Sequence, residues 1–296
     1  MLSILLPVYN FDVRPLVNKL HEQLSTTGVT YEIICLDDAS DSSFTSMNKA
    51  IEDVEGITYS ISEINHGRVA TRQFLAEKAK YNWLLFLDAD VMPKSEHFIR
   101  TYLEILNQDF QAVYGGFAYY EDVPVEDQRL RWNYGRSKEQ VSAKHRNQKP
   151  YKITISANLL IQKDIFKQLN TQIDQKGYGY DNYFASLLKQ HQVKVMHIDN
   201  EVYHLGLESN ATYLNKVEEA IQNLLNLDKS GAIAQNENSL LNAYHKIRSM
   251  KLNGLCAFLF DRFNTKIKRN LLSAKPSIRL LQFYKLGYIC YLDLNS

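Results

Sequence analysis

WLLFLDAD, residues 83–90, is the stretch of this sequence that says most about its fold. Its first five residues are apolar without alternation, which is typical of a strand buried on both faces of a sheet. Two acids, Asp88 and Asp90, follow directly. Residues two apart in an extended chain face the same side, so both carboxylates converge where the strand ends. We therefore predict a buried strand that delivers a pair of acids to one edge of a sheet.

Segments of the same kind lie on both sides of this strand. Further strands are expected at residues 3–9 (SILLPVY), 32–38 (EIICLDD), 57–62 (ITYSIS), 112–120 (AVYGGFAYY) and 153–162 (ITISANLLIQ). Helical spacing of apolar residues is found in the segments 13–24, 44–54, 69–80 and 95–106. Strands without internal alternation that are separated by helices indicate a parallel sheet covered on both faces. The expected fold class is therefore α/β.

The sequence changes character after residue 120. Residues 121–150 are polar and aromatic without a clear period, so we expect a long loop with a helical piece, a kind of segment that often serves binding. A glycine-rich turn at residues 177–180 leads into a helix, and the chain reads as helical from residue 209 onward, with a break near 229–236. We predict two domains, an α/β domain over residues 1–208 and a helical extension over residues 209–296.

Composition places the chain among ordinary globular proteins. Apolar residues make up 45% and charged residues 23%, which excludes a disordered chain, a collagen-like repeat and a coiled-coil rod. The three cysteines are widely spaced, so we expect a reducing compartment and no disulfide framework or structural zinc site. The first residues lack the pattern of a signal peptide, and the longest near-apolar stretch, 252–260, is too short to cross a bilayer. We expect a cytoplasmic protein.

Charge is distributed unevenly along the chain. Residues 245–296 contain ten basic and two acidic residues, a net charge of +8, and since the whole chain carries +1, residues 1–244 carry −7. The basic segment also has apolar residues along one helical face, namely Ile247, Leu252, Leu255, Phe258, Leu259 and Phe263. Basic amphipathic helices suit anionic membrane surfaces, so we predict peripheral membrane contact through residues 245–296. The alternative is a helix that packs on its own domain behind a solvated basic face; no recognition module is present, so nucleic acid is not an expected partner.

The acid pair Asp88 and Asp90 favours a bound cation. Two carboxylates held this close repel each other unless a cation lies between them, and hard oxygen ligands favour Mg²⁺ or Mn²⁺, which keep open positions for substrate phosphates. Glycine loops of the Walker or dinucleotide-binding type do not occur in the sequence. Arg68 and Arg72, four residues apart at a helix start, would supply positive charge to a phosphate instead. The alternatives are a solvated strand end and a solvated helix start.

Taken together, these motifs resemble family 2 glycosyltransferases of the GT-A fold. The resemblance is carried, in chain order, by SILLPVYN (3–10), DDASD (37–41), NHGRVATRQFLAEKA (65–79), LLFLDAD (84–90), SANLLIQKDIF (156–166), GYGYDNYFASLL (177–188) and HIDNEVYHLG (197–206). It implies a Rossmann-like mixed sheet flanked by helices over residues 1–208, followed by the helical extension. It also implies an enzyme of bacterial-type surface-glycan assembly that transfers a hexose from a nucleotide sugar.

The resemblance assigns roles to single residues. Positions that hold the nucleotide base are matched by Pro7, Tyr9 and Asp38, with Asp38 expected to bond the uracil edge. Asp88 matches the first acid of the DxD motif, which contacts ribose or metal, and Asp90 matches the last acid, which ligates the divalent ion. His204 matches a histidine that completes the metal site in several relatives. Its alternative is a structural histidine at a strand end.

The general base departs from the family pattern. Relatives carry Glu-Asp after the glycine-rich turn, where an acid takes the proton of the acceptor hydroxyl, whereas this chain has Asp181-Asn182. Asn cannot accept a proton at any relevant pH, so Asp181 is the candidate base in that motif. Its side chain is shorter than that of Glu, and an N-cap of the following helix is the structural alternative. Glu121 and Asp122 are the reserve candidates.

The combined expectation is an inverting, metal-dependent glycosyltransferase that uses a UDP-sugar and modifies a hydroxyl of a glycan or a lipid-linked acceptor. Two rival functions stay open. A non-catalytic relative that binds a sugar nucleotide or a glycan is favoured by Asn182. A nucleotidyltransferase on the same fold is disfavoured, because no GxGxR-type loop follows the first strand.

Overall fold

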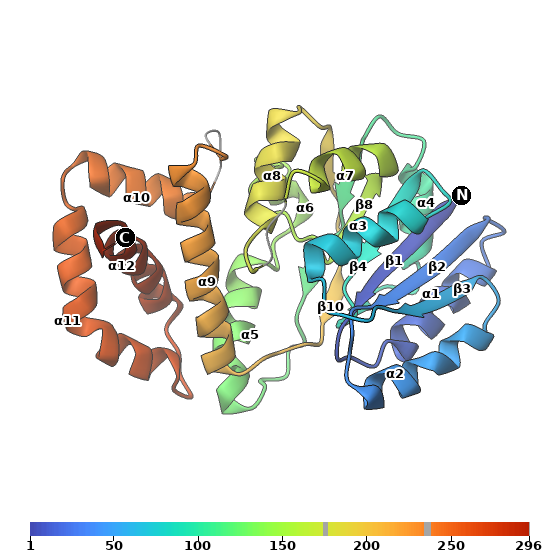
Figure 1. Ribbon diagram of the computed structural model, residues 1–296, viewed down its shortest axis with the longest axis horizontal. Coiled ribbons are helices and arrows are strands. Elements are labelled where there is room, and N and C mark those ends of the chain that lie inside the picture. Colours follow the sequence, from blue (N-terminus) through green and yellow to red (C-terminus); the bar gives the residue numbers. More distant parts are fainter. Residues whose placement is uncertain (174–176, 234–237, 296) are drawn as a thin grey trace. The chain divides into compact units, whose positions relative to one another are not determined.

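Figure 1 shows the computed structural model, which describes residues 1–173, 177–233 and 238–295. The chain divides into two compact units. The first, the sheet unit, comprises Met1–Ala118, Val141–Lys176 and His191–Gly206. The second, the helical unit, comprises Tyr119–Gln140, Gly177–Gln190 and Leu207–Ser296. Residues 119–140 and 177–190 thus belong to the helical unit, and the predicted division into two domains at residue 208 stays a prediction.

A seven-stranded sheet with the order β3-β2-β1-β4-β8-β6-β9 forms the centre of the sheet unit. Its strands are β1 (Leu2–Val8), β2 (Tyr31–Asp37), β3 (Ile57–Ile61), β4 (Trp83–Leu87), β6 (Ala112–Tyr114), β8 (Asn158–Gln162) and β9 (Val195–His197). The first four are parallel neighbours, as predicted, whereas β8 runs antiparallel to β4 and β6. The sheet is therefore mixed and not parallel throughout, because an apolar run indicates burial of a strand but not its direction.

The helices of the sheet unit connect these strands. They are α1 (Arg14–Ser25), α2 (Ser42–Asn48) with the 3₁₀ helix η1 (Lys49–Asp53), α3 (Arg68–Lys78), α4 (Phe98–Ile105), α6 (Ala143–Arg146) and α7 (Lys163–Asn170). The strand order turns at β1, since β2 and β3 continue on one side of it and β4 lies on the other. Ligands of open α/β sheets bind beyond the carboxyl ends of the strands at such a turning point. The ends of β1, β2 and β4 therefore mark the place for a site.

AVYGGFAYY, predicted as one strand, is divided between two sheets. The second sheet has the order β5-β10-β7 and consists of β5 (Val91–Pro93), β7 (Phe117–Ala118) and β10 (Val202–His204). Gly115 and Gly116 separate β6 from β7. A Cβ on Gly115 would lie 2.3 Å from the side-chain nitrogen of Asn158, and Gly116 has a φ of +91°, which favours glycine. The glycine pair thus ends one strand and lets the chain enter the other sheet.

The helical unit has a core of its own. Its elements are η2 (Glu126–Gln128), α5 (Arg129–Lys138), α8 (Asp181–Gln190), α9 (Asn210–Lys229), α10 (Ser239–Ser249), α11 (Asn253–Leu271) and α12 (Ile278–Asn295). Leu130 of α5 is buried in the same apolar cluster as Leu214, Phe260 and Leu281, which explains why a segment predicted as mostly loop belongs to this unit. The predicted break near 229–236 falls between α9 and α10, where residues 234–237 lie outside the described chain. Among the described helices, none has the length and apolar character needed to cross a membrane.

Candidate functional site

The polar residues that follow β1, β2 and β4 lie at one edge of the large sheet. Tyr9 comes directly after β1, Asp38 after β2 and Asp88 after β4. β1 pairs in parallel with both β2 and β4, so the carboxyl ends of the three strands are neighbours. This is the arrangement expected from the sequence for a ligand site at the turning point of the strand order.

Asp38 holds the loop in front of α3. Its two carboxylate oxygens accept hydrogen bonds from the backbone N–H groups of His66 and Gly67, each at 2.8 Å, and the side chain is buried. Gly67 has a φ of +85°, a conformation that a residue with a side chain rarely adopts. Tyr9, in contrast, is 56% exposed, and Pro7 is half-buried. A rigid acid therefore lies at the strand ends, and an exposed aromatic ring follows the neighbouring strand.

Asp88 is held by two arginines of α3. Arg68 Nη2 lies 2.6 Å from Asp88 Oδ2, and Arg72 Nη2 lies 2.6 Å from Oδ1. Both guanidinium groups also bind Ser156, Arg68 at the hydroxyl (3.1 Å) and Arg72 at the carbonyl (2.9 Å). Arg72 is almost fully buried, while Arg68 is partly exposed. Asp88, Arg68 and Arg72, which were predicted separately as donor-binding residues, thus form one cluster. Of its two arginines, Arg68 is the one that reaches the surface.

Asp90 and His204 are brought together by the small sheet. β10 runs antiparallel to β5, with His204 opposite Val91. This pairing places the imidazole beside Asp90, the residue before Val91. His204 Nε2 lies 3.3 Å from Asp90 Oδ2, and its ring stacks on Phe117 with the ring centres 5.3 Å apart. Burial raises the pKa of the Asp90 carboxyl, but the hydrogen bond and the electrostatic interaction with His204 and the charge of Arg68 outweigh it, so this pKa lies below its ordinary value. The carboxylate is therefore charged at neutral pH.

Gly206 makes room for the Asp90 carboxylate. A Cβ at this position would lie 2.0 Å from Asp90 Oδ2, a separation that no pair of atoms tolerates without bonding. The backbone N–H of Leu205 donates to the Asp90 carbonyl at 2.8 Å and holds the two segments in contact. No role was predicted for this glycine. The available signal was its place two residues after the predicted metal-binding histidine.

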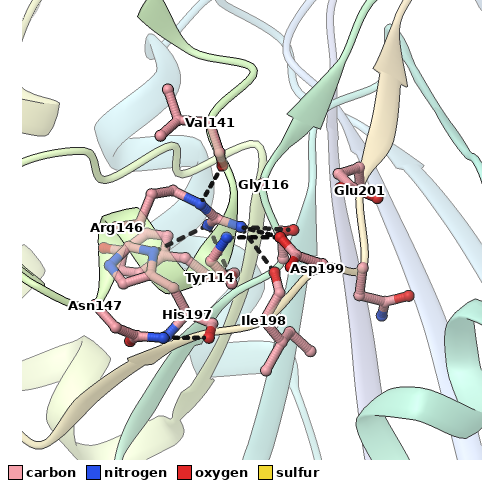
Figure 2. A network of polar contacts seen from close by, with 12 residues as sticks. Tyr114, Gly116, Val141, Arg146, Asn147, His197, Ile198, Asp199 and Glu201 are labelled. Atoms are coloured by element: carbon pink, nitrogen blue, oxygen red, sulfur yellow. Dashed lines mark hydrogen bonds and ion pairs between the residues drawn. The ribbon is translucent and has the colours of Figure 1, made fainter.

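A buried arginine fixes the chain where it passes from the large sheet to the small one. Figure 2 shows Arg146 between the residues that leave β6 and those that join β9 to β10. Its guanidinium donates to the carbonyls of Tyr114 (3.2 Å) and Ile198 (2.8 Å), and its Nε donates to that of Val141 (2.9 Å). These bonds position β7 and β10, and with β10 they position His204. Arg146 was missed by sequence reasoning, because one arginine in a polar segment carries no signal of burial.

His197 is the neutral partner of this arginine. Arg146 Nη1 lies 2.9 Å from His197 Nδ1, and the Pro150 carbonyl lies 2.8 Å from Nε2. Since a guanidinium only donates and a carbonyl only accepts, the imidazole carries its proton on Nε2 and accepts at Nδ1. Burial lowers the pKa of His197 to about 4; the charge of Arg146 acts in the same direction, and the bond to Pro150 opposes it. The imidazole therefore stays neutral at pH 7.

The pair of Asp90 and His204 fits a divalent cation that keeps open positions. A carboxylate oxygen and an imidazole nitrogen are both accepted as ligands by Mn²⁺. Within the described residues, no group of three or more His, Cys, Asp and Glu side chains is placed to hold a metal ion. A cation here would take its other ligands from bound phosphate and water, as Mg²⁺ and Mn²⁺ commonly do. Both oxygens of Asp88, the other predicted ligand, are bonded to arginines.

Asp181 begins α8 in the helical unit, directly after the glycine-rich turn. Gly179 in that turn has a φ of +95°, and a Cβ on it would lie 2.9 Å from the Cβ of Ala220 in α9. The Asn182 side chain donates to the Gly179 carbonyl at 3.2 Å and accepts a hydrogen bond from Asn238 at 2.9 Å. The residue that stands in place of the expected second acid therefore links the turn to the start of α10. Asp181 is left as the acid of the motif.

Comparison of the sequence with known protein families gives a match. The sequence profile described as Glycosyl transferase family 2 matches residues 3–169. No curated protein sequence gave a match.

Solved structures give a second comparison. The mannosyltransferase PcManGT from Pyrobaculum calidifontis, in complex with GDP-Man and Mn²⁺, has a TM-score of 0.58 at 11% identity, over 100% of this chain and 88% of that one. S. aureus TarS 1–349 in complex with UDP-GlcNAc has a TM-score of 0.53 at 14% identity, over 99% and 91%. Glucosyl-3-phosphoglycerate synthase from Mycobacterium tuberculosis, in complex with Mn²⁺, UDP and glucosyl-3-phosphoglycerate, has a TM-score of 0.52 at 14% identity, over 76% and 79%. At these identities the likeness establishes the shared GT-A fold.

Proposed function

The chain belongs to glycosyl transferase family 2, and we propose that it transfers a hexose from a UDP-sugar to a hydroxyl of a glycan or a lipid-linked acceptor. Family membership establishes that the chain is a glycosyltransferase. We propose the identity of its donor, its metal ion and its acceptor. The observation that supports it most is the contact between Asp90 and His204 at 3.3 Å, made by two strands far apart in the sequence. It lies immediately after the strand that ends at the candidate ligand site.

The nucleotide binds at the ends of β1 and β2. Tyr9 offers an exposed ring to the base, with Pro7 beside it in sequence. Asp38 is held in place by two backbone N–H groups, and a carboxylate retains acceptor capacity for an N–H of uracil. Arg68, which reaches the surface, contacts the diphosphate, while the buried Arg72 keeps Asp88 in position.

Asp90 and His204 hold a divalent cation, Mn²⁺ or Mg²⁺. When bound, such an ion stabilises the negative charge that develops on a departing diphosphate. Gly206 leaves the space that the Asp90 carboxylate occupies, and stacking on Phe117 orients the His204 ring. The protein thus supplies a charged oxygen from the residue before β5 and an oriented nitrogen from β10.

Asp181 takes the proton of the acceptor hydroxyl. The acceptor oxygen forms its bond to the anomeric carbon on the face opposite the leaving group, and the bond from that carbon to the phosphate oxygen breaks. The nucleoside diphosphate leaves with the electron pair, and a single displacement inverts the configuration of the sugar. Asn182 cannot take this part, because an amide does not accept the proton and its side chain is bonded to Gly179 and Asn238.

Donor turnover tests the proposal. Purified chain is incubated with UDP-, GDP- and CMP-sugars in the presence of Mn²⁺, with and without glycan and lipid-linked acceptors, and the released nucleotide is measured. We expect release from UDP-sugars, and loss of this release in Asp90→Asn. Binding of UDP-sugars without any release from them would support the non-catalytic alternative. Release from GDP-sugars alone would correct the donor.

A further inference from the structure

α11 has two apolar faces, of which one packs. Its buried residues, Cys256, Ala257, Phe260, Ile267 and Leu271, belong to the core of the helical unit. The apolar face predicted from the sequence lies elsewhere on the helix and just before it, and its large side chains at Leu252, Leu255, Phe258 and Phe263 are exposed. Phe258 exposes 63% of its surface and Leu255 exposes 55%. Packing within the unit therefore accounts for the first face and for Ile247 of the predicted face, but not for these four exposed side chains.

The exposed apolar residues share their side of the helix with cations. We call Leu255, Phe258, Arg262, Lys266 and Arg269 the outer face of α11. Successive members are three or four residues apart, which places all five on one side of an α-helix. The three cations are exposed, and among the residues that the structure describes none of them makes an ion pair. Both the apolar groups and the charges of the outer face are therefore available to a partner.

Lys268 provides the contrast on the same helix. Its Nζ lies 2.9 Å from Glu218 Oε1 on α9, so a cation that points into the unit is paired there. In the sequence of α11 the single acid is Asp261. The positive charge of the outer face is thus not neutralised within its own helix, and it lies in the segment 245–296 that carries a net charge of +8.

We propose that the outer face of α11 docks the protein on an anionic lipid bilayer. Phe258 and Leu255 enter the headgroup boundary, and the three cations contact lipid phosphates. Helices that lie in a membrane interface combine apolar side chains that enter the headgroup boundary with Lys and Arg that attract anionic lipid, and the outer face of α11 offers both kinds of group. The positive charge of the outer face complements anionic lipid headgroups. A partner that offered only negative charge would leave Leu255 and Phe258 exposed, whereas a bilayer covers them. This docking goes beyond the proposed transfer reaction and does not depend on it.

Co-sedimentation with vesicles tests the cations. The full chain is mixed with vesicles of phosphatidylcholine alone and of phosphatidylcholine with phosphatidylglycerol, and only the second kind is expected to bind it. The variant Arg262→Gln/Lys266→Gln/Arg269→Gln should partition about 100-fold less, since each cation near an anionic surface contributes a factor of roughly five. The control variant Lys80→Gln/Lys144→Gln/Lys149→Gln removes the same charge from exposed positions of the sheet unit and should bind as the parent does.

Fluorescence tests the apolar residues. In Phe258→Trp, binding to anionic vesicles should shift the tryptophan emission to shorter wavelength. The parent chain, which contains Trp83 and Trp132, gives the emission to which this shift is compared. Leu255→Ser/Phe258→Ser should lower vesicle binding while circular dichroism stays unchanged, because both residues are exposed. An emission of the Phe258→Trp variant that does not shift although vesicles are bound would contradict insertion of the helix.

Three results would overturn the docking. The first is equal partition of the parent and the Arg262/Lys266/Arg269 variant. The second is a dimer that dissociates in Leu255→Ser/Phe258→Ser while vesicles are not bound, which would identify a second copy of the chain as the occupant. The third is binding to duplex DNA that the outer-face cations control, again without vesicle binding. No sugar donor is present in these measurements, so their outcome is separate from that of the proposed transferase function.

Discussion

At the scale of single residues, Gly206 is the position on which the Asp90 carboxylate depends. In Gly206→Ala the added Cβ would lie 2.0 Å from Asp90 Oδ2, so the carboxylate or the segment at residue 206 has to shift, which disturbs the contact of Asp90 with His204. We expect the affinity for Mn²⁺ in the presence of UDP to fall by roughly 10–100-fold, the usual effect of disturbing the orientation of a metal ligand. Titration calorimetry measures this change.

Gly254→Ala is the matched control for Gly206→Ala. A Cβ at Gly254 meets nothing within 4 Å, so the same chemical change is harmless there. Undiminished Mn²⁺ affinity in Gly206→Ala, with the melting temperature of the parent, would remove Asp90 from the metal site.

Asp181→Asn tests the proposed base. The substitution should leave donor and metal affinity intact and lower turnover by ~10²–10⁴-fold, the usual contribution of a positioned general base. Asn182→Asp is the companion variant: it restores the second acid of the family pattern but breaks the donation to the Gly179 carbonyl. Full activity of Asp181→Asn would transfer the role to the exposed Glu121 or Asp122, and a lowered melting temperature would indicate a helix cap instead.

His197 makes the stability of the sheet unit depend on pH. Its pKa is about 4 in the folded chain and about 6.5 in an unfolded one, so between these values the unfolded state binds more protons. The contribution of His197 to the free energy of unfolding is therefore fully present above pH 6.5. It falls by about 3 kcal/mol as the pH decreases toward 4. His197→Gln keeps a donor and an acceptor but does not titrate. Denaturant unfolding at pH 7 and pH 4.5 should show a smaller loss in this variant, and an equal loss in both proteins would contradict the buried neutral imidazole.

At the scale of elements, α11 offers two phenylalanines in opposite environments. Phe260 is buried against Tyr284 of α12, with ring centres 5.1 Å apart, whereas Phe258 is largely exposed. Phe260→Ala should cost about 3–5 kcal/mol of unfolding free energy, the usual effect of emptying an aromatic site in a core. Phe258→Ala should change it by less than about 0.5 kcal/mol. Chemical denaturation compares the two, and similar losses would mean that the outer face is packed.

The same helix shows what periodicity predicts and what it leaves open. Helical spacing identified the apolar residues around Leu255 and Phe258, but spacing alone does not distinguish a face that packs from a face that is exposed. The strands β1 to β4 were predicted closely, because each is an apolar run bounded by polar turns. AVYGGFAYY was predicted wrongly as a single strand, because its apolar residues continue across the glycine pair at which the chain changes sheets.

The sequence predicted the individual residues of the candidate site better than the contacts between them. The acids at the strand ends follow from local pattern, and His204 was named from the resemblance. Its contact with Asp90 depends on the pairing of β10 with β5, which joins distant segments and leaves no local signal. Arg68 and Arg72 were predicted near phosphate, and the structure bonds both to Asp88, because a half-buried carboxylate is stabilised by a counter-charge.

At the scale of the whole molecule, the two units differ in the roles proposed for them. The sheet unit carries the residues proposed for the donor and the metal ion, and the helical unit carries Asp181 and the outer face of α11. Variants at the donor and metal residues and variants on the outer face should therefore affect separate properties. Changes at Asp90 or Gly206 should alter donor and metal binding, whereas changes on the outer face should alter only vesicle binding.

Donor binding with and without Mn²⁺ tests the proposed metal site most directly. The melting temperature of the full chain is measured with UDP in the presence of Mn²⁺ and in the presence of EDTA, for the parent and for Asp90→Asn. A ligand at about 100 times its Kd adds roughly 2.7 kcal/mol of stability. We predict a clear rise with UDP and Mn²⁺, a weak one under EDTA, and no effect of Mn²⁺ in Asp90→Asn. Equal stabilisation by UDP with and without Mn²⁺ in the parent would contradict the assignment of Asp90 and His204 as metal ligands.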